Sequence, residues 1–317
     1  MEQRVPTTDS VSTPNAAANR VSIAQAIFAL NSNVTTRAML LIVPILGFGV
    51  LAVLLGQTNS WDLRNYHLYD GWAFWTGRGD SDFAVAQLQS YFNPLLATFT
   101  YLLFTNLSPW LSTFALGVLQ GANFLPIYFI ARRLLQLPDE TSRGWIPLGV
   151  SLVGTMGATQ VSELGGSMGD NLVSLPILCA FALVLRNSEL KVVEGAFAGL
   201  LIGMTTGIKL TAAPFAIGLI TSALLLAWSQ RNRWSILVCT GAAVALGFLL
   251  TDGFWMLRMY REFGNPLHPM FAHLLGSDYV PPMPVRDDRF IPQTVVEWLF
   301  YPLVWLISAH RVSDTWF

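Results

Sequence analysis

Seven apolar runs, each long enough to cross or nearly cross a lipid bilayer, constrain the fold of this chain more than any other feature. They are Ala38–Gly56, Trp110–Ala131, Trp145–Ser162, Asn171–Leu185, Val192–Ile208, Leu210–Trp228 and Trp234–Leu250. Backbone groups inside the hydrocarbon must be hydrogen-bonded within the protein, which leaves helices or closed barrels. The runs show no alternation of polar and apolar residues, so the sequence predicts an all-α polytopic transmembrane helix bundle of about 7–9 spans.

The composition supports a protein that has the lipid bilayer as its main partner. The chain is 53% hydrophobic and 12% charged, with a mean hydropathy of +0.50, whereas soluble domains carry about 25% charged residues. The net charge is −1 and the one basic block is Arg132-Arg133, so no nucleic-acid partner is expected. Cys179 and Cys239 lie in apolar runs and are expected to act as small hydrophobic residues.

Two domains are predicted from the distribution of polar residues. Residues 1–37 are polar and are expected to form a flexible cytoplasmic N-terminal tail, followed by Ala38–Gly56 as an uncleaved first span. Residues 38–317 are expected to form the transmembrane domain. Because the sequence stops at Phe317, shortly after an apolar run, we expect a bundle that is incomplete at its C-terminus.

The positions of Lys and Arg predict how the chain crosses the membrane. Two further apolar runs, Asn93–Phe104 and Pro292–Ser308, are ambiguous as spans. Basic residues prefer the cytoplasmic side, and all the basic clusters between the spans reach that side if Asn93–Phe104 lies in the membrane without crossing it. Three segments then face outward, and the first of them is a long loop expected to carry membrane-lying helices. These segments are Gln57–Phe92, Glu163–Asp170 and the loop from about Asp252 to Ile291.

The stretch Trp61–Trp72 in the first outer loop packs acids, an arginine, a histidine and tyrosines directly after the first span. If it is helical, Asp62, Tyr66 and Asp70 lie on one face at i, i+4 and i+8, with His67 elsewhere around the helix. A partly desolvated carboxylate at such a place can act as a general base. The alternative is an interfacial amphipathic helix with a solvated polar face.

The second outer segment is a tight glycine-rich turn that contains Glu163 and Asp170. Its glycines allow the backbone to approach a ligand closely. Asp170 can instead cap the helix that follows, although a cap does not account for Glu163. Because Asp62, Glu163 and Asp170 face the same side, they could together bind a divalent cation such as Mg²⁺ or Mn²⁺, and the need for a metal stays open.

Lys209 interrupts an apolar stretch at the outer end of a span and is one of two lysines in the chain. An ionisable residue at this depth suggests function, and a lipid phosphate is its natural partner. The alternative is a lysine that snorkels to the interface. The preceding row Gly195-x3-Gly199-x3-Gly203-x3-Gly207 is interpreted as helix packing alone.

The third outer segment contains Arg258 and a predicted turn at Gly264-Asn265-Pro266. Arg258 lies outside, against the positive-inside rule, and binding an anionic headgroup or diphosphate would account for it. Pairing with Asp252 or Glu262 is the alternative. Arg258 and His268 are the substrate contacts expected from this segment.

These motifs, in this order and with this sidedness, resemble the GT-C glycosyltransferases, the group that includes protein O-mannosyltransferases and the lipid A aminoarabinose transferase. The resemblance covers roughly residues 38–271. It rests on Asp62-x3-Tyr66-His67 with the following Gly77-Arg78, on Tyr91-Phe92-Asn93-Pro94-Leu95-Leu96, on Asp170 at the start of a span, on Gly207-x-Lys209, and on Gly264-Asn265-Pro266-Leu-x-Pro269.

The resemblance implies inverting sugar transfer from a polyprenyl-phosphate donor to a glycan, lipid or protein acceptor on the outer leaflet. Asp62 is then the general base, Asp170 orients the acceptor or a metal, and Lys209 and Arg258 hold the donor phosphate. Arg64, Tyr66, His67, Asp70 and Glu163 are expected to contact substrate. The paired acids often found in the family's first loop are not adjacent here, because Leu63 follows Asp62, and Asp70 is the expected substitute.

Two other functions fit parts of the sequence. A transporter or lipid flippase would spread polar residues through the midplane of several helices, and the chain has no internal repeat of the kind found in many transporters. A non-catalytic membrane subunit is compatible with the short length. The clustering of polar residues on one side favours an enzyme in a multi-pass membrane protein, which we expect in a bacterial inner membrane with its N-terminus in the cytoplasm.

Overall fold

The computed structural model describes residues 34–137, 140–278 and 288–307. The predicted tail lies outside the described residues except for its last four, which already belong to helix α2 (Val34–Leu55). The chain divides into two compact units, Met1–Leu40 and Leu41–Phe317. The second unit contains every feature discussed below.

The described residues fold into helices and contain no strand, as the apolar runs predict. The helices that follow α2 differ widely in length and come in the following order. They are α3 (Leu68–Thr76), α4 (Leu95–Asn106), α5 (Pro109–Gly121), α6 (Phe124–Leu134), α7 (Glu140–Thr155), α8 (Ala158–Ser162), α9 (Asp170–Val184), α10 (Val192–Ile208), α11 (Ala213–Ala227), α12 (Arg233–Phe263), α13 (Ala272–Leu275) and α14 (Val295–Ile307). The fold is therefore an all-α helical membrane bundle.

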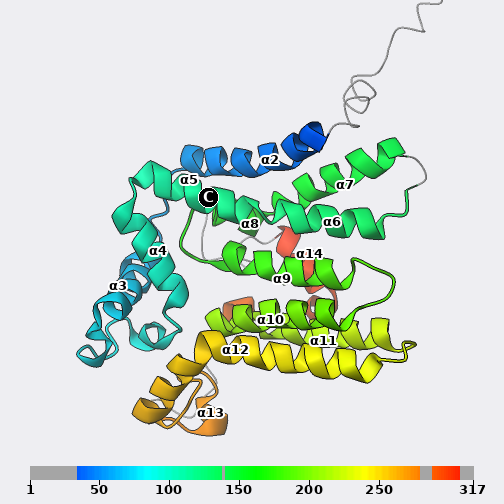
Figure 1. The fold of residues 1–317 in the computed structure, drawn as a ribbon. Coiled ribbons are helices and arrows are strands. Elements are labelled where there is room, and N and C mark those ends of the chain that lie inside the picture. Colours follow the sequence, from blue (N-terminus) through cyan, green and yellow to red (C-terminus); the bar gives the residue numbers. More distant parts are fainter. Residues whose placement is uncertain (1–33, 138–139, 279–287, 308–317) are drawn as a thin grey trace, which may run out of the picture. The chain divides into compact units, whose positions relative to one another are not determined.

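Four stretches of the described chain are long and apolar enough to cross a membrane. They are Ala38–Leu55, Pro109–Leu134, Leu210–Ala227 and Arg233–Phe263. The shorter apolar helices are α4, residues Gly144–Thr155 of α7, α9 and α10. In Figure 1, α9, α10, α11 and α12 run side by side, whereas α3 and α4 lie together at one end of these helices.

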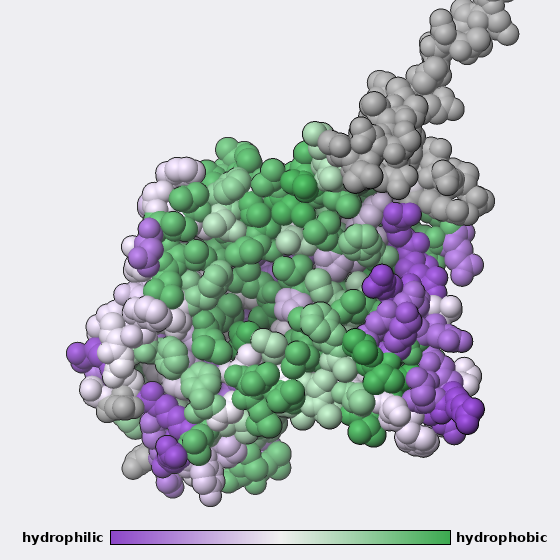
Figure 2. Space-filling view, viewed as in Figure 1, coloured by the Kyte–Doolittle hydropathy of each residue, from purple (hydrophilic) through white to green (hydrophobic). Residues whose placement is uncertain are grey.

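On the face seen in Figure 2, apolar residues cover the long helices and hydrophilic residues gather at the two ends of these helices. One hydrophilic end contains the connections α6–α7, α9–α10 and α11–α12 (Figure 1). Their basic residues include Arg132 and Arg133 at the end of α6, Arg186 before α10 and Arg231 before α12. The basic clusters that were predicted to share one side therefore do lie at one end of the bundle.

Several predicted spans have different boundaries in the structure. The run Trp110–Ala131 is broken at Ala122 and Asn123, where buried Asn123 donates its side-chain amide to the Asn171 carbonyl at 2.8 Å. The run Trp145–Ser162 is broken at Gly157, whose backbone is extended. The expected outer loop that starts at Asp252 is wrong in its first part, because α12 continues to Phe263. The polar residues after Asp252 end the apolar run, but the helix continues through them.

Glycines bring α10 and α12 into close contact along their whole shared length. A Cβ atom on Gly199 would lie 2.4 Å from the Thr240 carbonyl oxygen, and one on Gly203 would lie 2.1 Å from the Val244 carbonyl oxygen. On the opposite helix, a Cβ on Gly247 would lie 2.4 Å from the Leu200 carbonyl oxygen. The interpretation of the glycine row as helix packing is thus confirmed. This packing also fixes the end of α10 against the middle of α12, where the candidate site lies.

Candidate active site

A cavity of about 410 Å³ opens at the end of the helices that carries α3 and α4. Its size is in the range of small-molecule sites. Its wall comes from the first outer loop, the turn before α9, the end of α10, the middle of α12 and the loop after α12. Eight of the predicted site residues line it: Asp62, Tyr66, His67, Asp70, Glu163, Asp170, Lys209 and His268. The fold therefore brings together, in one cavity, predicted site residues that are up to about 200 positions apart in the chain.

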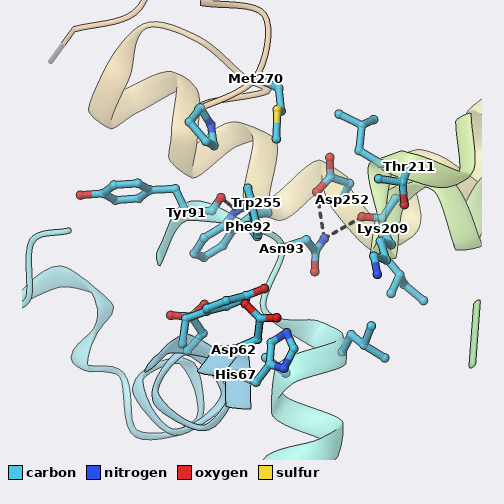
Figure 3. A pocket seen from close by; sticks show the side chains of 18 of the residues that line it. Asp62, His67, Tyr91, Phe92, Asn93, Lys209, Thr211, Asp252, Trp255 and Met270 are labelled. Carbon is cyan, nitrogen blue, oxygen red and sulfur yellow. Dashed lines mark hydrogen bonds between the residues drawn. The ribbon is translucent and has the colours of Figure 1, made fainter. Parts of the chain in front are cut away.

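One helix carries four of these side chains. It starts at Trp61, passes through a π-helical turn at Leu63–His67 and continues as α3. An i→i+5 bond from the Leu68 N–H to the Leu63 carbonyl adds about one residue to this turn. The expectation that His67 lies elsewhere around the helix is wrong, because the wider turn brings His67 to the cavity together with Asp62 (Figure 3). π-helical turns of this kind occur frequently at functional sites.

Tyr66 and Asp70 on this helix have strongly shifted proton affinities. Burial raises the pKa of Tyr66 well above its usual range, and the neighbouring Asp62 carboxylate, to which the phenol is hydrogen-bonded, raises it further. Tyr66 is therefore protonated at neutral pH and donates its proton to the bond with Asp62. Burial alone raises the pKa of Asp70 to about 7. Asp70 thus exchanges between its neutral and charged forms near neutral pH.

His67 joins the outer helix to the glycine-rich turn. Its Nδ1 lies 2.8 Å from the Ser167 hydroxyl. Burial, and then the positive charge of Lys209, lower the pKa of His67 to about 4. The imidazole is therefore neutral at pH 7 and contributes hydrogen bonding rather than charge.

The glycine-rich turn is held in place by Gln120 of α5, a residue that is fully buried. The Gln120 side chain accepts a bond from the Gly165 N–H at 2.6 Å and donates one to the Gly166 carbonyl at 3.1 Å. Gly165 and Gly169 adopt positive φ values of 73° and 84°, which only glycine reaches without strain. The turn therefore presents Glu163 in a fixed position.

Glu163 is buried at the cavity wall with 7% of its surface exposed. Burial raises its pKa to about 7, and the negative charge of Asp170 raises it as well, whereas Lys209 acts in the opposite direction. Its Oε2 atom is buried and has no hydrogen-bond partner. Glu163 is thus a second acid of the cavity that is partly protonated at neutral pH.

Lys209 stands at the end of α10 and pairs with Asp170 at the start of α9. The Nζ–Oδ1 distance is 2.7 Å, and Nζ also donates to the Met168 carbonyl at 3.0 Å. The two side chains stay partly accessible, with 26% and 48% of their surface exposed. The alternative role of Asp170 as a helix cap is not observed, because Gly169 occupies the cap position without a side-chain bond. Its carboxylate instead turns to Lys209.

Asn93 links three elements at the floor of the cavity, and sequence reasoning gave it no role of its own. Its Nδ2 lies 3.0 Å from the Gly207 carbonyl, 2.9 Å from the Thr251 carbonyl and 2.8 Å from Asp252 Oδ1. Figure 3 shows the bond to Asp252. Its Oδ1 accepts the Leu95 N–H at the start of α4. Asn93 therefore ties the start of α4 to the end of α10 and the middle of α12.

The loop after α12 contributes His268. The predicted turn is present, because Gly264 ends α12 at a φ of 70° and fully buried Asn265 bonds to the Leu267 N–H and the Met270 carbonyl. His268 Nδ1 lies 2.7 Å from the Ser277 hydroxyl, and the ring stacks on Phe263 with centroids 3.8 Å apart. Burial lowers its pKa to about 4, so the ring is neutral at pH 7.

Two predicted substrate contacts lie outside the cavity. Arg64 is exposed and donates to the Asn59 side chain at 2.5 Å, because it lies on the far side of the outer helix. Arg258 pairs with Glu262 at 2.8 Å, as the alternative interpretation of this arginine predicted. The two side chains meet because Glu262 lies one turn further along α12. Arg258 also lies over the Trp255 ring at 5.0 Å. Neither arginine lines the cavity, although Arg258 shares a small second pocket with Asp70 and Trp255.

Within the described residues, no three His, Cys, Asp or Glu side chains come together in a way that could hold a metal ion. The predicted trio of Asp62, Glu163 and Asp170 shares the cavity but does not form such a group.

Fold and cavity together define a polytopic membrane protein with an acidic pocket and one lysine at the end of its helices. Comparison with protein families gives a match to glycosyltransferase family 87 over residues 91–283. Because the match covers more than half of the chain, the protein belongs to glycosyltransferase family 87 and is a membrane glycosyltransferase of the GT-C type. No curated protein matches the chain significantly. No solved structure matches it significantly either.

The family assignment refines the resemblance seen in the sequence. It supports the GT-C type, but not the specific likeness to protein O-mannosyltransferases or to the lipid A aminoarabinose transferase. It also favours an enzyme over a transporter or a non-catalytic subunit. The matched region starts at Tyr91, so the helix that carries Asp62, Tyr66 and Asp70 precedes it.

Proposed function

We propose that this glycosyltransferase moves a sugar from a polyprenyl-phosphate donor to an acceptor hydroxyl, with inversion at the anomeric carbon. The observation that carries the proposal is that Asp62 and Lys209 line one cavity at the end of an apolar helix bundle. A carboxylate for the acceptor and a cation for the phosphate thus face the same space. The apolar surface of the helices next to it suits a donor with a prenyl chain.

Asp62 is the best candidate for the general base among the acids of the cavity. Asp170 is engaged by Lys209, and Asp70 and Glu163 are buried, each with only 7% of its surface exposed. Asp62 is half-buried and receives a hydrogen bond from a phenol that stays protonated. This bond fixes the direction of the carboxylate, and a base must be held within hydrogen-bond reach of the proton that it takes.

In the proposed step, Asp62 accepts the proton of the acceptor hydroxyl while the acceptor oxygen attacks the anomeric carbon. The bond between that carbon and the phosphate oxygen breaks, and polyprenyl phosphate leaves as an anion. Lys209 stabilises the negative charge that develops on the leaving phosphate. The Asp170 carboxylate gives way as the phosphate approaches Lys209 and then orients the acceptor. One attack opposite to the leaving group inverts the configuration.

A donor panel tests this assignment. The purified protein in lipid should transfer labelled sugar from polyprenyl-phosphate hexoses and should be inactive with the same sugars as nucleoside diphosphates. The acceptors in the panel are a glycan, a glycolipid and a hydroxyl-containing peptide, because the cavity chemistry requires only a hydroxyl. Transfer from nucleotide sugars alone would contradict the proposed donor class.

We place the site on the outer face of a bacterial inner membrane, with the N-terminus in the cytoplasm, because the basic connections lie at the other end of the bundle. Single cysteines in a variant that lacks Cys179 and Cys239 test this orientation. A cysteine at Arg64 should react with a membrane-impermeant maleimide in intact cells. Cysteines at Asn187 and Asn232, both exposed, should react only after permeabilisation. The reverse labelling pattern would place the cavity in the cytoplasm.

A further inference from the structure

Two buried polar atoms without a hydrogen-bond partner line the cavity, and they come from different walls. Glu163 Oε2 belongs to the turn before α9, and His268 Nε2 belongs to the loop after α12. Both side chains are more than nine-tenths buried, with 7% and 4% of their surface exposed. Buried polar groups in native proteins are nearly always paired, so each unpaired one requires an explanation.

Both groups are held rigidly before any ligand binds. The His268 ring is fixed by the Ser277 hydroxyl at Nδ1, by stacking on Phe263 and by the edge of Tyr91, whose centroid is 5.0 Å away. The Glu163 backbone is fixed by a bond from the Gly166 N–H to its carbonyl at 2.9 Å, within the turn that Gln120 holds. Polar groups that are held rigidly while one of their atoms lacks a hydrogen bond are typical of preorganised binding sites.

The chemistry of the two atoms selects one part of the donor. A hydroxyl group both donates and accepts a hydrogen bond, so it can satisfy a carboxyl oxygen and an imidazole nitrogen in either protonation state or tautomer. A prenyl chain offers neither function, and a phosphate offers only acceptors to a wall that already contains acids. The same cavity also has apolar surface from Tyr91, Phe92 and Trp255 (Figure 3). A sugar ring has polar edges and apolar faces, so it suits a cavity that offers both kinds of contact.

We infer that Glu163 and His268 are the two residues that bind hydroxyl groups of the donor sugar and thereby select the sugar that is transferred. The inference rests on the proposed polyprenyl-phosphate donor. Because Lys209 and Asp170 act on Glu163 electrostatically, Glu163 lies on the phosphate side of the cavity. His268 comes from the other wall, so the sugar ring lies between the two residues. Neither residue takes part in bond making or breaking.

The test compares two soluble probes, a short-chain prenyl-phosphate hexose and the same prenyl phosphate without the sugar. Binding to the purified protein is measured by calorimetry with a panel of hexoses and pentoses. The wild-type protein should bind one sugar-bearing probe about tenfold or more tightly than the sugar-free probe. Glu163→Gln and His268→Ala should each remove most of this preference and leave the affinity for the sugar-free probe unchanged within twofold. Glu189→Gln and His273→Ala make the same changes at residues that are exposed and away from the cavity, so they should keep the preference.

A second arm uses only the wild-type protein, with sugar-bearing probes that each lack one hydroxyl, so it does not depend on the folding of any variant. Removing a hydroxyl that Glu163 or His268 binds should abolish most of the preference over the sugar-free probe, whereas removing any other hydroxyl should leave that preference in place. The inference is overturned if the wild-type protein does not distinguish the two probes, or if the variants lose affinity for both equally. Selective sugar binding without any transfer in the donor panel would contradict the proposed reaction and leave this inference standing.

Discussion

Replacing Asp62 with asparagine is expected to lower the rate of sugar transfer about 10²- to 10⁴-fold, the range that a positioned general base contributes. Asparagine has the same shape and can still accept the hydrogen bond from the Tyr66 phenol, so the outer helix should keep its conformation. It cannot take a proton from the acceptor. The measurement is the turnover number with a saturating donor, together with donor affinity, which should change little.

Asp278→Asn is the matched control, because Asp278 is exposed and does not line the cavity. Its turnover should equal that of the wild-type protein. If Asp62→Asn retains activity within about threefold of the wild type, the base is another acid. Asp70 and Glu163 would then be the next candidates, since each has a pKa of about 7.

Replacing Gly203 with alanine should have the largest effect on stability. The added Cβ would lie 2.1 Å from the Val244 carbonyl oxygen and 2.8 Å from its carbonyl carbon, and both are backbone atoms that cannot rotate away. Helices α10 and α12 must therefore separate, which we expect to cost about 1–3 kcal/mol or more, as overpacked cores do. Transfer should fall as well, because Lys209 ends α10 while Asp252 lies on α12. Thermal unfolding in detergent measures the first effect.

Gly241→Ala is the control for this substitution. Gly241 lies on α12 as well, but a Cβ there meets nothing within 4 Å. Alanine also favours a helix over glycine, so this variant should unfold at or above the wild-type temperature. If the two variants unfold at the same temperature, the close approach of α10 and α12 is not what holds the bundle together.

The sequence predicted the helices well wherever apolar composition alone determined them. Val192–Ile208 matches α10 at both ends, and Asn171–Leu185 differs from α9 by one residue at each end. The predicted helix ends were wrong where a helix continues beyond its apolar run. Helix α12 continues through Asp252, Arg258 and Glu262 to Phe263, because charged residues end the apolar run without breaking backbone hydrogen bonds.

For the site, the sequence indicated which acids and which lysine would meet, because sidedness placed them at one end of the bundle. It could not indicate which way each side chain points. Arg64 lies next to the site residues in sequence but faces away, and His67 reaches the cavity through a π-helical turn that no residue pattern predicts. The ion pair between Lys209 and the Asp170 carboxylate was not predicted either.

Asn93 shows why long-range contacts of this kind escape a reading of the sequence alone. Its three acceptors on Gly207, Thr251 and Asp252 lie more than 110 positions away along the chain. Two of them are backbone carbonyls, which carry no sequence signal at all. Only the folded arrangement identifies this amide as the link between the start of α4 and the packed helices.

The most direct measurement of the central claim is transfer of labelled sugar from a polyprenyl-phosphate hexose by wild-type and Asp62→Asn protein side by side, with the anomeric configuration of the product read by NMR. We predict transfer with inversion by the wild-type protein and a loss of at least 100-fold in Asp62→Asn, as expected for the removal of a general base. A product with retained configuration, or equal activity of the two proteins, would contradict the account.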